Sequence, residues 1–157
     1  MDTDAERYLL GGILRDPNTI SPAIEMIAED DFFYLERHQL IWRAMKNLYS
    51  RGTAIDMLTL PAELESMGKL REAGNREYIF DLMESVASAA NVEWNLEHLR
   101  NKHVLRKLIK MSSETIKQAM DATSSPDEVL QSAERSVFAI AEKQVKNTLR
   151  PIEKFMS

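Results

Sequence analysis

The stretch from Val92 to Asp121 contains neither glycine nor proline, the two residues that most often interrupt a helix. At about 1.5 Å per residue, one helix over this stretch would be about 45 Å long. Ser125 then supplies an N-cap and Pro126 a first helical position, which predicts a second helix over about 127–146. Two long helices joined by so short a turn form an antiparallel hairpin, and the chain is predicted to be all-α.

The apolar residues of the first of these helices lie on two different faces. Val92, Leu96 and Leu99 fall within about 60° of one another around the helix. The apolar residues further along lie on the nearly opposite side, and they are Leu105, Leu108, Ile109, Ile116 and Ala119. We therefore expect the first third of this helix to pack on the N-terminal part of the chain and the remainder to pack on the second helix.

Phe138 stands apart on the second predicted helix, about 120° from the centre of its apolar stripe. A hairpin of two helices has little core of its own. An apolar residue of this size outside the seam therefore predicts packing against another copy of the chain. The alternative interpretation is that Phe138 only lines the edge of the seam between the two helices.

The chain divides into three predicted segments. Residues 1–90 are expected to form a compact head of five or six short helices, residues 91–146 the hairpin, and residues 147–157 the start of a truncated linker. The boundary of the linker rests on a predicted break in the helix at Thr148 to Pro151.

Several local signals place helices in the head. Asp2 or Thr3 can cap a first helix over about 3–15, and Gly11-Gly12 inside it implies a close contact with another helix. Ser21-Pro22 is predicted to open a short helix, and a longer one is expected over about 36–50.

No catalytic, metal or cofactor motif is found in the sequence. The only Gly-Lys pair, Gly68-Lys69, is followed by leucine and lacks the upstream glycine of a phosphate-binding loop. His98 and His103 would point about 140° apart on a helix, which argues against a zinc site, and the chain has no cysteine. Asp30-Asp31 is a common pair at helix starts. We expect the histidines to be buried or capping residues and the chain to bind rather than catalyse.

The net charge of −5 is unevenly distributed, with −8 over residues 1–96 and +3 over residues 97–157. The positive charge lies in a run that consists of Arg100, Lys102, Arg106, Lys107 and Lys110. A solvated helix face explains such a run, and a surface for an acidic partner or nucleic acid is the sharper interpretation. Because no apolar run approaches the roughly 20 residues of a membrane-spanning helix and the N-terminus is acidic, we expect a soluble cytoplasmic protein.

An ordered series of motifs runs along the chain from about Asp4 to Lys143. It consists of Ala5 to Leu14; Asp31-Phe32-Phe33 followed by His38 and Ile41; Gly52 with Ile55-Asp56 and Thr59-Leu60; Leu64 to Gly68 with Leu70; Tyr78; and Ser88-Ala89-Ala90-Asn91. This series resembles the N-terminal domain of the bacterial replicative DNA helicases, the DnaB-type ring helicases. Gly74-Asn75 stands where that family commonly has two glycines, and Trp94 stands where tyrosine is usual.

The resemblance implies an all-helical, non-catalytic domain with a head and a hairpin. In this family the hairpins pair between subunits, and three such dimers form the N-terminal collar of a hexamer. The collar docks the C-terminal domain of primase and helicase loaders. ATP and magnesium belong to a separate motor domain after a linker helix, so no cofactor is expected here. The chain is expected to stop inside that linker, at Pro151 to Ser157, and DNA contact is expected to be weak or indirect.

The resemblance also implies which residues face partners. Asp4 and Glu6 open the first helix, and Tyr78 lies near the end of the head; with Ile109 and Ile116 of the hairpin, they are expected on the primase side. For Ile109 and Ile116, packing in the hairpin seam is the alternative. The position of Phe138 on its helix makes it the candidate for self-association.

Two other functions stay open from the sequence. One is a stand-alone all-α adaptor or loader protein of similar shape. The other is a nucleic-acid-binding helical hairpin that uses the basic run beginning at Arg100.

Overall fold

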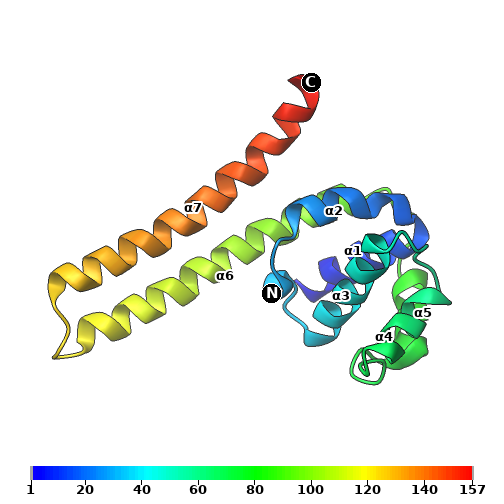
Figure 1. The fold of residues 1–157 in the computed structure, drawn as a ribbon, viewed down its shortest axis with the longest axis horizontal. Coiled ribbons are helices and arrows are strands. Elements are labelled where there is room, and N and C mark those ends of the chain that lie inside the picture. The colour runs from blue at the N-terminus through cyan, green and yellow to red at the C-terminus, as the bar shows by residue number, and fades with distance from the viewer. Residues whose placement is uncertain (1, 157) are drawn as a thin grey trace. The chain divides into compact units, whose positions relative to one another are not determined.

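The protein is all-α in the residues that the computed structural model describes, which are 2–156 for the backbone and 2–143 for the side chains (Figure 1). The elements are α1 (Thr3–Arg15), η1 (Pro17–Thr19), α2 (Ile20–Met26), η2 (Asp30–Phe32), α3 (Glu36–Ser50), α4 (Thr59–Ser66), α5 (Asn75–Glu84), α6 (Val92–Met120) and α7 (Pro126–Met156). Two compact units divide at Lys102 and His103, inside α6. The expected domain boundaries at residues 90 and 146 stay predictions.

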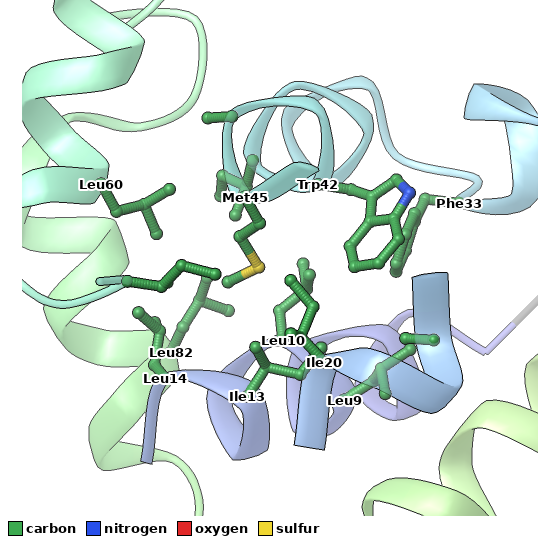
Figure 2. Close-up of a cluster of buried hydrophobic side chains, with 14 of the residues drawn as sticks. Leu9, Leu10, Ile13, Leu14, Ile20, Phe33, Trp42, Met45, Leu60 and Leu82 are labelled. Carbon is green, nitrogen blue, oxygen red and sulfur yellow. The ribbon is translucent and has the colours of Figure 1, made fainter. Parts of the chain in front are cut away.

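The first unit has one hydrophobic core, built from α1, α3, α4, α5 and the beginning of α6. Figure 2 shows the side chains of α1 pointing toward Trp42 and Met45 of α3, with Leu60 and Leu82 beside them. Val92, Leu96 and Leu99 are all buried in this core. The prediction that the first third of the long helix packs on the N-terminal part is therefore confirmed.

Gly11 and Gly12 allow α1 to approach the end of α5 and the start of α6. A Cβ atom on Gly11 would lie 2.2 Å from the Leu82 carbonyl oxygen, and one on Gly12 would lie 2.5 Å from Cγ2 of Val92. Neither position has room for a larger residue. This contact confirms the expected close helix packing, and it offsets the roughly 1 kcal/mol that each glycine costs inside a helix.

Asp2 caps the N-terminus of α1 and connects it to α6. One carboxylate oxygen accepts the backbone N–H of Ala5 at 3.0 Å, as predicted for an N-cap, and the other lies 2.8 Å from Nε2 of His98 on α6. The hydrogen bond from Ala5 lowers the pKa of Asp2, with a smaller contribution from His98. His98 is thus a capping partner, as the sequence analysis expected of the histidines.

Two predicted helix boundaries are wrong. Asp16 caps a 3₁₀ turn that leads directly into α2, so the helix begins at Ile20 and Ser21 is not its N-cap. Pro22 still lies in the first turn, where its missing N–H removes no helical hydrogen bond. The predicted break at Thr148 to Pro151 is absent, since α7 continues to Met156.

In the second unit, α6 and α7 run antiparallel and are joined by the turn after Met120, as predicted (Figure 1). On α6, Leu108, Met111 and Thr115 are half-buried, which marks the face that α7 covers. On α7 the matching half-buried residues are Val129, Ala133, Ser136 and Ile140. None of residues 104–143 is buried.

The expectation that Ile109 and Ile116 lie in this seam is wrong. They are 66% and 59% exposed, because they lie about 100° around α6 from Leu108, Met111 and Thr115. A two-helix hairpin can cover only one stripe of each helix, and on α6 the stripe with Ile109 and Ile116 stays uncovered. None of the helices in the described residues combines the length and apolarity needed to cross a membrane.

Candidate protein-docking site

A buried carboxylate, Glu6, organises one end of the first unit. Its side chain is only 1% exposed. One oxygen accepts the backbone N–H of Tyr34 at 2.6 Å, and the other lies 3.4 Å from the N–H of Leu35 and 2.7 Å from Nδ1 of His38. Three hydrogen bonds of this kind replace the water that a buried carboxylate loses.

The local sequence explains why Glu6 is inside. It stands four residues before Leu10 and eight before Leu14, so all three lie on one stripe of α1. Leu10 and Leu14 are both buried, and Glu6 shares their direction. A charged residue on such a stripe needs partners from another element. The backbone of Tyr34 and Leu35, just before α3, and the His38 side chain in α3 supply them.

His38 connects Glu6 to Tyr78. Nδ1 of His38 faces Glu6, and Nε2 lies 2.6 Å from the hydroxyl of Tyr78. With Nδ1–H donating to the carboxylate, Nε2 of the neutral ring accepts the Tyr78 O–H, a tautomer assigned from the network. The Glu6–His38–Tyr78 network thereby links α1, α3 and α5, and the prediction that His38 is buried is confirmed.

Gly74 sets the position of Tyr78 at the start of α5. Its φ of 98° lies in the left-handed region, and a Cβ atom there would lie 2.6 Å from Cβ of Tyr78. Asn75 also has a positive φ, of 63°. Two successive left-handed residues therefore form the turn that the sequence marked as unusual, and only glycine at position 74 leaves room for the tyrosine.

The half-buried Tyr78 ring has arginines beside it. The guanidinium carbon of Arg37 lies 4.8 Å from the ring centroid, in a cation–π arrangement. Burial raises the pKa of the Tyr78 phenol, and the charges of Arg37 and Arg7 offset this only in part. The phenol is therefore neutral at physiological pH. Arg7 also pairs with Asp4, whose carboxylate is 3.8 Å away. We call Asp4, Arg7, Arg37 and Tyr78 the Tyr78 surface cluster.

The structure places the predicted partner residues in two groups. Asp4, Glu6 and Tyr78 belong to the same region of the first unit, while Ile109, Ile116 and Phe138 are exposed on the second unit. Because Glu6 is buried, it cannot touch a partner directly in this structure. It can act only through the groups that it binds, which are His38, with Tyr78 beyond it, and the backbone of Tyr34 and Leu35.

Sequence reasoning did not find the connection through His38 or the role of Arg37. A signal for the first was available, since Glu6 falls on the buried stripe of α1 and His38 on the buried side of α3. Pairing the two required the tertiary fold. Arg37 gives no signal, because an exposed arginine in the first turn of a helix has no distinctive pattern.

Comparison with known proteins identifies relatives of this architecture. The family model of the DnaB-like helicase N terminal domain matches residues 1–101. The replicative DNA helicase DnaB of Buchnera aphidicola is 35% identical over 149 residues, which are 94% of this chain and 32% of that protein. The DnaB helicase of Geobacillus stearothermophilus is 31% identical over 150 residues, 96% of this chain and 33% of that protein. The chain thus spans about a third of the length of these relatives.

Two solved structures share the fold. The crystal structure of the N-terminal domain of DnaB helicase from Mycobacterium tuberculosis has a TM-score of 0.82 at 28% identity, covering 88% of this chain and 97% of that chain. A DnaB-like replicative helicase, described together with its interactions with primase, has a TM-score of 0.71 at 22% identity. It covers 97% of this chain and 34% of that chain, and at this identity it shows the fold alone.

The network makes a prediction about stability. We expect Glu6→Gln to lower the free energy of unfolding by about 1.5–3 kcal/mol, because one carboxylate oxygen becomes an NH₂ group that faces hydrogen-bond donors. Tyr78→Phe is expected to cost about 1 kcal/mol, since Nε2 of His38 loses its donor. Urea unfolding followed by circular dichroism measures both.

Glu72→Gln is the matched control, because Glu72 is exposed on the segment before α5. Its effect should stay within about 0.5 kcal/mol. Equal effects of Glu6→Gln and Glu72→Gln would show that the buried carboxylate does not hold the three helices together.

Proposed function

Because the chain belongs to the DnaB-like helicase N-terminal domain family, we propose that it is the non-catalytic collar domain of a hexameric replicative DNA helicase. In this proposal it joins subunits through its hairpin and docks primase and a helicase loader during DNA replication. ATP and magnesium would be bound by a motor domain elsewhere in the full protein. The cytoplasmic location stays a prediction.

The observation that carries the proposal is the uncovered apolar stripe of the hairpin. On α6 it consists of Leu105, Ile109, Ile116 and Met120, and on α7 of Leu130 and Val137, all exposed. We call these six residues the hairpin stripe. Exposed apolar residues in such a periodic arrangement are typical of an interface rather than of solvated surface.

The stripe forms one continuous face. On each helix it is rotated by about 100° from the seam, in the same sense along the chain. Because the two helices are antiparallel, equal rotations in the same sense bring both halves of the stripe to the same side of the hairpin. A second hairpin can cover this side and present its own stripe in return, which is a two-fold symmetric contact. Three such dimers would make the hexameric collar.

Phe138 lies outside the hairpin stripe. It is 68% exposed and points about 180° from the seam of α7, at the outer edge of the hairpin. It remains the second candidate for self-association, and the contact it would make is distinct from that of the stripe.

The hairpin proposal is tested by light scattering. We expect the double variant Ile109→Ser, Ile116→Ser to weaken self-association at least about tenfold, because two central apolar side chains leave the interface. Glu114→Ser is the control, since Glu114 is exposed on the opposite side of the same helix. If only Phe138→Ala lowers the assembly mass, the contact runs through the outer edge instead. If no variant does, the hairpin does not join subunits.

For primase docking, the Tyr78 surface cluster is the best-supported surface. Tyrosine and arginine are the residue types that most often dominate interface energies. The network holds Tyr78 in place before binding, which reduces the entropy lost on docking. Glu6 would then influence docking from the interior, as a positioning residue. The choice of primase as the partner follows from the DnaB-like helicase family to which the chain belongs.

Docking is tested by calorimetric titration with the C-terminal domain of the cognate primase. We expect Tyr78→Ala to weaken binding at least about tenfold, which corresponds to about 1.4 kcal/mol. Tyr49→Ala is the control, because Tyr49 is a tyrosine at the end of α3 that is exposed and does not belong to the cluster. Equal affinities for the Tyr78→Ala variant and the unmodified chain would remove the cluster from the primase interface.

The structure does not favour the nucleic-acid-binding alternative. Arg100 of the basic run has a side chain only 11% exposed, and its guanidinium lies 3.4 Å from Glu97. Arg106 lies 3.5 Å from Nδ1 of His103. Arg100 and Arg106 are thus already engaged with neighbours. The mass of the native polypeptide distinguishes the adaptor alternative from the collar proposal. A stand-alone adaptor would have a mass of about 18.0 kDa.

A further inference from the structure

The first turns of α6 present an aromatic side chain that belongs to neither the hairpin stripe nor the Tyr78 surface cluster. Trp94 is 65% exposed, more than any other aromatic residue of the first unit. Its indole stacks on the ring of His98, one turn further along, with the ring centroids 5.0 Å apart and the planes 9° from parallel. His98 therefore covers one face of the indole, and the opposite face is open to solvent.

This stack is connected to α1. Nε2 of His98 lies 2.8 Å from one carboxylate oxygen of Asp2, and the other oxygen accepts the backbone N–H of Ala5. The imidazole, and the indole that stacks on it, are thus held in place by contacts with two helices. A ring that is fixed before binding loses little entropy on docking, and tryptophan is among the residue types that most often dominate interface energies.

The charges around Trp94 are mainly negative. Between Arg76 and Arg100 the chain has five acidic residues and no lysine or arginine. Two of the five, Glu93 and Glu97, are close to Trp94 on α6, and both are exposed. Glu97 lies one turn along the helix and about 60° around it, so its carboxylate is at the edge of the indole. Glu93 lies in the first turn of α6, where it offsets the positive end of the helix dipole.

The cations that follow on α6 leave this negative charge largely uncompensated. The side chain of Arg100 is only 11% exposed, and its guanidinium lies 3.4 Å from Glu97, whose side chain is still 66% exposed. Lys102 lies two turns beyond Trp94 and about 80° around the helix, and its charge contributes to the lowered pKa of Asp2. The open face of the indole thus has carboxylates at its edge, which favours a cation and disfavours the phosphates of a nucleic acid.

We propose that Trp94 binds an arginine side chain in a basic peptide segment of a protein partner. The planar guanidinium would stack on the open face of the indole, the aromatic ring that attracts cations most strongly. Its N–H groups would donate to the carboxylates of Glu97 and Glu93, which a planar guanidinium can do while it stacks. The site is independent of the collar function and shares no residue with the Tyr78 surface cluster or the hairpin stripe.

The test is an NMR titration of the full 157-residue chain with the peptide acetyl-Ala-Arg-Ala-Arg-Ala-Arg-amide. We expect saturable shifts of the Trp94 indole N–H and of the backbone amides from Glu93 to His98, with an affinity that falls as NaCl rises from about 50 to about 200 mM. Trp94→Ala should weaken binding at least about fivefold, measured on the same backbone amides. Because the indole is exposed, the circular dichroism of this variant should be unchanged.

Phe80→Ala is the matched control, since Phe80 is 50% exposed in the same segment without lysine or arginine, and it should leave the affinity unchanged. The double variant Glu93→Gln, Glu97→Gln should weaken binding at least about threefold. The variant Glu77→Gln, Asp81→Asn removes the same charge from α5 and should have a smaller effect.

Five results would overturn the proposal. They are the absence of saturable shifts, unchanged binding by Trp94→Ala, equal effects of the two charge variants, equal binding of the peptide with glutamine in place of arginine, and tighter binding of an oligothymidylate, which would assign a nucleic acid. Shifts of the same amides on concentrating the chain without peptide would assign the indole to a contact with a second copy, and would also contradict it.

Discussion

A pair of antiparallel helices can cover only one stripe of each helix, and the second unit depends on this limit. Its seam uses Leu108 and Met111 on α6, together with small and medium-sized residues of α7. The hairpin stripe, which includes Ile109 and Ile116, stays exposed. Burial of apolar surface stabilises by roughly 25 cal/mol per Å², so a partner that covers the stripe would stabilise this unit further. Association is therefore the expected state of a hairpin with this sequence.

The first unit, in contrast to the hairpin, buries its apolar residues within itself. Its core is closed, and Gly11 and Gly12 let α1 pack closely on its neighbours. Glu6 is the exception inside that core, and its carboxylate is satisfied by His38 and two backbone amides. The same histidine fixes the hydroxyl of Tyr78 at the surface. An interior residue can in this way influence a docking surface that it never reaches.

The sequence predicted the local structure better than the pairings between elements. The bounds of α3, the Asp2 cap and the close contact at Gly11-Gly12 depend on neighbouring residues or on one glycine pair, and all were found. The rotation of the hairpin seam was not predictable, because α6 has two apolar stripes and periodicity alone does not say which one α7 covers. The partner of Glu6 was missed for a similar reason. A charged residue on a buried stripe indicates that another group must pair with it. Only the fold shows that His38 is this group.

We infer above all that a second copy of the chain covers the hairpin stripe. Sedimentation equilibrium of the unmodified chain, measured from low to high micromolar concentration, tests it most directly. We expect the weight-average mass to rise with concentration from 18.0 kDa to at least twice that value. A mass that stays at 18.0 kDa over the whole range would contradict it.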